Sequence, residues 1–362
     1  MLNTTSVRPF LPGCISILFF TRGRGRGHAM PDITIVDELR EQVNGIEVRF
    51  ASYGTGAATL RENGYDVIDM ELREDTALLD ATVVCTQITD HLRPHLIISH
   101  EEVGALLAAR GLRTRCAYIT DFFKDPNALD TKGLEHADEV IFIGNEGVFT
   151  EPPRLRNKIC YVGPLVRKLA YRRADSARAR KELHLPSQGI VISCLPGSWR
   201  EESGPIAPLV ASAFQLLKQE AKQLVWIAGL DFAMLHDAFS ARNSILVKKD
   251  DWQLDRLMVA SNLVITRGSR NTMNELSALG IPSISLSYGL NWPDDVVANR
   301  IATNVHLNVQ GLTSSTLCRH MNDSLSKRSA VSMNGEWSAG LTGVISRLRY
   351  HIETIRSQLV RA

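Results

Sequence analysis

The sequence has no long hydrophobic run, no closely spaced pair of cysteines and no strong excess of charge of either sign. Although 44% of its 362 residues are hydrophobic, no apolar segment approaches the ~20 residues that a membrane-spanning helix needs. The formal net charge of +2 does not indicate a nucleic-acid partner. We therefore expect a soluble globular protein, long enough for two domains that each have a core.

Cysteines are few and widely spaced. The six are Cys14, Cys85, Cys116, Cys160, Cys194 and Cys318. None forms a C-x-x-C pair, which argues against both a disulfide framework and a structural zinc site. Residues 1–13 contain no signal-peptide core. We expect reduced thiols and a cytoplasmic location.

A glycine-rich turn follows the first apolar segment. Residues 15–20 are aliphatic or aromatic, Gly25 and Gly27 then alternate with arginines, and helical periodicity begins just after His28. This pattern indicates a buried strand, a tight turn and a helix start. The glycines allow positive φ and close approach of a ligand, and the helix amides can face an anion. A turn that merely needs glycine is the alternative.

Strand-like and helical segments alternate through both halves of the chain. Such alternation predicts parallel pairing and two doubly wound α/β sheets. Gly163, Pro164 and Leu165 interrupt the pattern, and a charged run over residues 167–182 follows. We expect one domain over 1–165 and a second over 166–362, with the terminal helix free to cross back to the first.

Three titratable residues in the first half each follow a predicted strand, namely His28, Glu101 and Asp121. Ligands of doubly wound sheets bind at these carboxyl ends. His28 is the candidate general base, because a helix N-terminus disfavours the imidazolium and leaves a ring that can accept a proton. Asp121 either orients the histidine or is itself the base, and Glu101 is a third candidate. A purely structural His28 that caps the turn is the alternative.

The sequence does not predict a metal site. His100 precedes Glu101 and Glu102, but one histidine and two adjacent carboxylates do not define a coordination sphere. We expect neither an obligatory metal nor a cofactor, since helix N-termini can neutralise a leaving diphosphate.

The densest group of polar residues lies at positions 266–275. A predicted strand runs into Arg267, Gly268 and Ser269, and the following helix carries Thr272 and Glu275. Hydroxyls and free amides at a helix start can bind a phosphate, and a carboxylate one turn further on suits ribose hydroxyls. The alternative is an ordinary capped helix with Glu275 on a solvated face.

This segment resembles the GT-B glycosyltransferases of the MurG type, glycosyltransferase family 28. In that family a strand of the second domain runs into Arg-Ser-Gly, followed by Thr and Glu along the next helix. Arg267, Thr272 and Glu275 stand at the matching spacing, although Gly268 and Ser269 invert the usual order.

The first glycine turn carries the same resemblance. Gly25, Gly27, His28 and Pro31 are similar to the family's Gly-Gly-His-x-x-Pro turn, with Arg26 in place of one glycine. The similarity covers nearly the whole chain and is strongest between residues 263 and 282.

The resemblance implies two Rossmann-like domains that face a central cleft, the first for the acceptor and the second for the donor. It implies an inverting, metal-independent hexosyltransferase that moves a sugar from a nucleotide diphosphate-sugar, with UDP the expected nucleotide, to a hydroxyl acceptor. The acceptor is unknown; a lipid-linked one would add peripheral contact with the inner face of the membrane.

Further donor contacts follow from the resemblance. Arg167 lies in a segment similar to the family's interdomain crossing and would reach the donor. Gly197 and Ser198 would lie near the diphosphate, as would Ser269. The nucleobase would lie against the backbone around Asp251 and Trp252.

One departure concerns the donor sugar. The family has a glutamine a few residues before the position of Asn299, whereas this chain has Asp294, Asp295 and Val296. The sequence therefore does not identify the sugar that the donor carries. Related folds also support a second enzymatic function, that of a nucleotide-sugar hydrolase or epimerase. The non-enzymatic alternative is a subunit that binds a nucleotide-sugar without turning it over.

Overall fold

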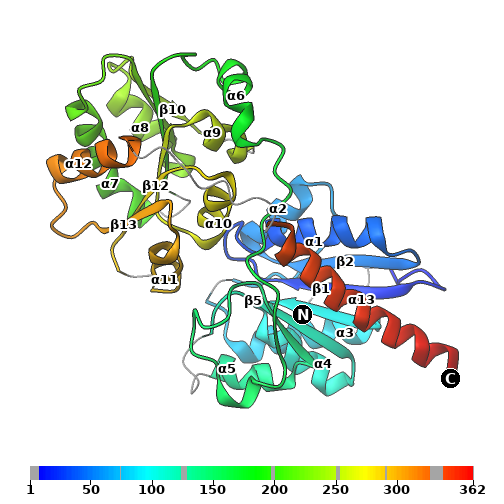
Figure 1. Ribbon diagram of the computed structural model, residues 1–362. Coiled ribbons are helices and arrows are strands. Elements are labelled where there is room, and N and C mark those ends of the chain that lie inside the picture. The colour runs from blue at the N-terminus through cyan, green and yellow to red at the C-terminus, as the bar shows by residue number, and fades with distance from the viewer. Residues whose placement is uncertain are drawn as a thin grey trace. The chain divides into compact units, whose positions relative to one another are not determined.

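The computed structural model describes residues 8–73, 75–123, 129–196, 200–249, 253–289, 292–326 and 337–361. The chain divides into two compact units (Figure 1). The first comprises Met1–Arg167 and Glu336–Ala362, and the second Lys168–Gly335. Among the residues described, no helix is both long enough and apolar enough to cross a membrane.

The first unit contains a seven-stranded parallel sheet in the order β3-β2-β1-β4-β5-β6-β7. Its strands are β1 (Ile15–Thr21), β2 (Ile46–Ser52), β3 (Val67–Asp69), β4 (Leu96–His100), β5 (Arg115–Thr120), β6 (Glu139–Phe142) and β7 (Ile159–Tyr161). Its helices are α1 (Ala29–Gln42), α2 (Gly54–Glu62), α3 (Leu78–Leu92), α4 (Val103–Leu112), α5 (Leu129–Gly133) and α13 (Trp337–Arg361), with 3-10 turns at Leu134–His136 and Pro153–Leu155.

Burial explains why the central strand is a continuous apolar run. All seven residues of β1 are buried, because β2 and β4 flank it and helices cover the sheet. On one face Ile17 and Phe19 share a core with Leu39 of α1 and with Leu348 and Ile352 of α13. The C-terminal helix is therefore part of the first unit's core, and Figure 1 shows it, in red, beside α1.

The second unit repeats the architecture with six parallel strands in the order β10-β9-β8-β11-β12-β13. The strands are β8 (Ile190–Leu195), β9 (Lys222–Ile227), β10 (Ile245–Lys248), β11 (Leu263–Thr266), β12 (Ser283–Ser287) and β13 (Asn304–Asn308). The helices are α6 (Ser176–Glu182), α7 (Arg200–Leu216), α8 (Phe232–Phe239), α9 (Leu254–Ala260), α10 (Arg270–Leu279), α11 (Trp292–Arg300) and α12 (Ser314–Ser326), with 3-10 turns at Arg173–Asp175 and Gly229–Asp231.

The strand orders locate the binding edge of each sheet. In the first sheet the order reverses between β1 and β4, and in the second between β8 and β11. Crevices outside the carboxyl ends of strands at such reversals are where doubly wound sheets bind ligands. The predicted doubly wound parallel sheets are thus confirmed, and the residues that follow β1, β4 and β11 lie at the binding edges.

Candidate active site

The glycine turn after β1 delivers His28 to the start of α1. Gly25 has a φ of +64°, a left-handed conformation that glycine adopts readily. His28 occupies the N-cap position of α1, yet its side chain makes no capping hydrogen bond. The imidazole is therefore not used to cap the turn and is available for another contact.

That contact is with Glu101. Nε2 of His28 lies 3.0 Å from Oε2 of Glu101, which follows β4, the neighbour of β1 in the sheet. The side chains are 15% and 5% exposed, respectively. A hydrogen bond of this kind in a partly buried setting fixes the orientation and tautomer of an imidazole. The structure thus joins two of the three residues singled out in the sequence.

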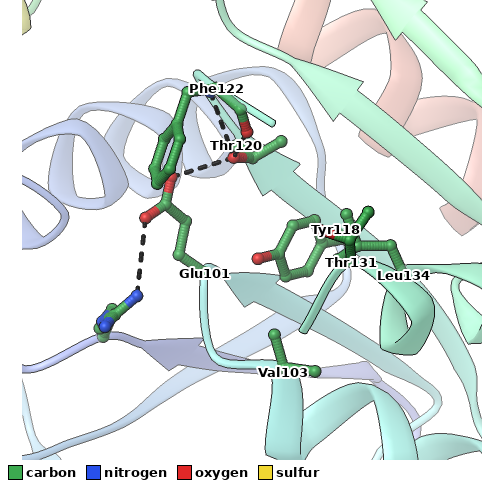
Figure 2. A pocket seen from close by; sticks show the side chains of 8 residues that line it. Glu101, Val103, Tyr118, Thr120, Phe122, Thr131 and Leu134 are labelled. Carbon is green, nitrogen blue, oxygen red and sulfur yellow. Dashed lines mark hydrogen bonds and ion pairs between the residues drawn. The ribbon is translucent and has the colours of Figure 1, made fainter. Parts of the chain in front are cut away.

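Glu101 is held from two further sides (Figure 2). The Thr120 hydroxyl donates to Oε1 at 3.0 Å, and Nη1 of Arg22 is 4.0 Å from Oε2. Burial disfavours the charge of the Arg22 guanidinium, but Glu101 and neighbouring groups outweigh that penalty and raise the pKa of Arg22. The carboxylate therefore sits among donors that favour its ionised form.

A pocket opens beside this carboxylate, with about 310 Å³ of space that is partly open to solvent. Figure 2 shows Tyr118, Thr120 and Phe122 around Glu101, all from the end of β5 and the residues that follow it. The remaining lining residues are Arg22, Val103, Thr131 and Leu134. The pocket combines an apolar wall with a carboxylate, a guanidinium and three hydroxyls.

The His28–Glu101 contact determines which ring nitrogen can accept a proton. With Glu101 ionised, Nε2 must carry the hydrogen that it donates, so the lone pair is on Nδ1. Nδ1 is buried and has no hydrogen-bond partner within the described parts of the chain. This pattern is that of a histidine base whose second nitrogen is held by a carboxylate.

Asp121, the other carboxylate considered, also follows β5, and its Oδ1 is buried. It acts electrostatically on the neighbouring His100. The carboxylate hydrogen-bonded to His28 Nε2 is Glu101.

In the second unit, a glycine turn joins β11 to α10. Gly268 has a φ of +94°, and a Cβ placed on it would lie 3.0 Å from Cβ of Ser285. Ser269 is the N-cap of α10 but makes no side-chain cap; its hydroxyl instead donates to that of Thr272 at 3.0 Å. Amides at the start of α10 thus have no capping side chain from Ser269.

Two arginines beside this turn converge on one carboxylate. Oδ1 of Asp294 is 2.8 Å from Nη1 of Arg270, and Oδ2 is 3.7 Å from Nη2 of Arg267. Asp294 is 7% exposed. A buried carboxylate between two guanidiniums fixes the direction of both, so Asp294 acts on the arginines of the turn.

Glu275 lies on α10 and is only 8% exposed, so its side chain is not on a solvated face.

Asp295 contacts a different partner from its neighbour Asp294. Its Oδ1 is 3.7 Å from Nε2 of His306. Nδ1 of the same histidine shares a hydrogen bond with the Ser285 hydroxyl at 2.8 Å.

The resemblance implies further site residues, some of which the structure describes and some of which it does not. Arg167 is the last residue of the first unit's main segment, and Gly27 lies exposed in the turn before His28. Gly197, Ser198, Asp251 and Trp252 lie outside the described residues.

Several residues around His28 were not predicted from the sequence. Asp32 and Thr120 are buried hydrogen-bonding partners in this cluster, and Arg22 pairs with Glu101. The sequence could have indicated that Asp32 lies near His28, because Asp32 is four positions after His28, one turn along the same helix.

No family model matches the chain. A curated N-acetylglucosamine transferase of Caldicellulosiruptor saccharolyticus, named for UDP-N-acetylglucosamine and an N-acetylmuramyl-(pentapeptide) pyrophosphoryl-undecaprenol acceptor, is 24% identical over 318 residues. That alignment covers 79% of this chain and 80% of the relative. The lipid-A-disaccharide synthase of Paraburkholderia phymatum is 29% identical over 122 residues, 33% of this chain and only 31% of that protein.

Solved structures give the same picture of the fold. MurG of Acinetobacter baumannii superimposes with a TM-score of 0.67 at 13% identity, over 92% of this chain and 99% of MurG. The UDP-GlcNAc 2-epimerase of Neisseria meningitidis gives a TM-score of 0.66 at 14% identity, over 92% and 100%. The chain therefore has the GT-B fold of glycosyltransferases. Within that fold, the resemblance to the MurG-type transferases is confirmed by the similarity over most of the sequence.

Proposed function

We propose that the protein is a glycosyltransferase that moves a sugar from a nucleotide diphosphate-sugar to a hydroxyl acceptor, with inversion and without a metal. The observation that carries the proposal is the 3.0 Å contact between His28 Nε2 and Glu101 Oε2. It leaves the lone pair on Nδ1, a buried nitrogen at the sheet edge where ligands of this fold bind, and the acceptor hydroxyl has to enter that space to give up its proton.

The chemistry divides between the two units. The acceptor hydroxyl passes its proton to Nδ1 of His28, and Glu101 stabilises the imidazolium that forms. The acceptor oxygen bonds to the anomeric carbon while the bond from that carbon to the diphosphate oxygen breaks. Attack opposite the leaving group inverts the anomeric centre.

The second unit would hold the donor. The amides at the start of α10, with Arg267 and Arg270 fixed by Asp294, suit a diphosphate that gains charge as it leaves. Glu275, buried on α10, suits the ribose hydroxyls. We take UDP as the first nucleotide to test, because the curated N-acetylglucosamine transferase is named for a UDP-sugar.

Acceptor and location belong to the same proposal. A relative named for an undecaprenol-linked acceptor supports a lipid-linked acceptor here as well. It also supports a cytoplasmic enzyme in peripheral contact with the inner face of the membrane.

Nucleotide binding is tested by thermal shift with UDP, GDP, TDP and ADP. A ligand at about 100 times its dissociation constant should stabilise the protein by about 2.7 kcal/mol. Glu275→Ala should weaken binding by about 1–3 kcal/mol, while Ser277→Ala on the same helix should not. Equal affinity in both variants would contradict the placement of the donor.

Turnover is tested by release of nucleoside diphosphate from nucleotide-sugars, with and without hydroxyl acceptors. His28→Asn should lower turnover by about 10²–10⁴-fold at unchanged donor affinity, and the exposed His91→Asn should change neither. Since the epimerase shares the fold, donor consumption without acceptor would favour an epimerase or hydrolase. Binding without any turnover would favour a nucleotide-sugar-binding subunit.

A further inference from the structure

A second histidine lies buried behind His28. His100, the last residue of β4, is 2% exposed, and its Nδ1 is 2.7 Å from Oδ1 of Asp32. Asp32 is fully buried in α1, and its other oxygen accepts a hydrogen bond from the Thr21 hydroxyl at 2.6 Å. Both carboxylate oxygens thus have a close partner, and the imidazole is fixed through Nδ1.

Such a pair is costly for a fold to maintain. Taking an imidazolium and a carboxylate out of water carries a desolvation penalty that their attraction offsets only in good geometry, and an apolar pair would fill the same space. Buried titratable groups beside a candidate base are more typical of functional sites than of packing. The pair therefore calls for an explanation beyond stability.

The explanation lies in its contact with His28. The two imidazole rings meet edge to face, with centroids 4.8 Å apart and planes at 77°. His28 is thereby held between the ring of His100 on one side and the carboxylate of Glu101 on another. Rotation of the His28 ring away from Glu101 would break this contact.

The charges around both rings are defined. His28 faces Glu101 and, beyond it, Arg22; His100 faces Asp32, with Glu101 and Asp121 also acting on it. Burial opposes the charged form of His100, but the charge and hydrogen bond of Asp32 outweigh burial and raise its pKa. His100 therefore holds its proton to higher pH than an ordinary histidine.

We infer that His100, held by Asp32, is a positioning residue that fixes the His28 ring against Glu101. The edge-to-face contact of the two rings and the 3.0 Å contact of Nε2 with Glu101 together define one orientation of the His28 ring. The role of His28 as base rests on the proposed function; the arrangement of the two rings does not.

The NMR signal of the His28 Nε2 proton tests the inference on the whole chain without substrate, with the signal assigned by its loss in His28→Asn. In the wild type this proton should be observable and shifted downfield, because it is hydrogen-bonded to Glu101. In His100→Ala, which removes the ring that packs against His28, the signal should be lost. In His100→Phe, which keeps an aromatic ring at that place, the signal should remain.

Two results would overturn the inference: an unchanged Nε2 proton signal in His100→Ala, or the absence of that signal from the wild type. The second needs no variant, so a poorly folded variant leaves the test intact. With an active enzyme, kcat should fall in His100→Ala and recover in His100→Phe, while the KM for the donor stays the same in both. The expected NMR signals without activity in any variant would refute the proposed function and leave the positioning role standing.

Discussion

Glu101 meets His28 across 73 positions of sequence, and it does so from a backbone conformation that glutamate rarely adopts. Its φ is +58°, in the left-handed region where a non-glycine residue carries a cost of about 1–3 kcal/mol. The conformation occurs directly after β4, at the point where the carboxylate reaches His28, Thr120 and Arg22. At Glu101 this conformation directs the carboxylate toward its three partners.

Glu101→Gln should lower turnover by about 10²–10⁴-fold, because an amide of the same shape cannot stabilise the His28 imidazolium. Donor affinity should stay the same, since the nucleotide is assigned to the second unit. Steady-state kinetics with a binding titration measures both. Asp121→Asn is the matched comparison: a larger loss there than in Glu101→Gln would transfer the orienting role to Asp121.

Asp294→Asn should lower the free energy of unfolding by about 1–3 kcal/mol, because Arg270 and Arg267 lose the carboxylate on which they converge. Asp295→Asn should cost less, since its contact with His306 is a longer one of 3.7 Å. Urea unfolding compares the two. If Asp294→Asn kept its stability and changed only the sugar preference, Asp294 would read the donor sugar instead.

Gly268→Ala should destabilise the protein by about 1–3 kcal/mol. The cause is a φ of +94° and a new Cβ 3.0 Å from that of Ser285. Gly111→Ala is the control, because Gly111 lies in α4 with open space around its Cβ position; it should stabilise by about 0.5–1 kcal/mol. Equal effects of the two substitutions in urea unfolding would show that the turn tolerates a side chain.

Acid should weaken the attachment of α13 to the first sheet. Glu139 on β6 accepts from His351 Nε2 at 3.0 Å and is paired with Arg347, both on α13. Burial raises the pKa of Glu139, but the bonds to His351 and Arg347 outweigh burial and lower it. The stabilisation is therefore complete above about pH 4.5, the ordinary value, and is lost as pH falls through the lowered pKa.

The matched variant for this prediction is Glu139→Gln, which lacks the titration. Wild type should exceed it in free energy of unfolding at neutral pH, and the difference should shrink as the pH falls below about 4.5. A difference that is constant from pH 7 to pH 3 would mean that the ion pairs of Glu139 do not contribute.

The sequence predicted the parts of the site that follow from sheet geometry. In a parallel sheet the carboxyl ends of neighbouring strands meet at one edge, so residues after the strands at 15–20 and 96–99 were expected to lie close together. The choice of Glu101 over Asp121 as the partner of His28 could not be predicted. It depends on the positive φ of Glu101, which no local sequence preference for glutamate indicates.

Buried polar groups were the main omission. An aspartate in the first turn of a helix is favoured by the helix dipole in solvent. The spacing that places Asp32 one turn after His28 therefore does not show that Asp32 is buried or that it pairs with His100. Likewise α12 was not predicted, because Ser314–Ser326 is largely polar and buries only a narrow stripe that includes Leu317 and Met321.

The position of α13 bears on how the protein is made. Val344, Leu348 and Ile352 of α13 are all fully buried in the first unit's core, while the second unit is one uninterrupted stretch, Lys168–Gly335. During synthesis the second unit is complete before the ribosome has made the helix that closes the first. The first unit therefore finishes folding after the second, although most of it is synthesised earlier. Until then its apolar sheet face is a surface on which chaperones can act.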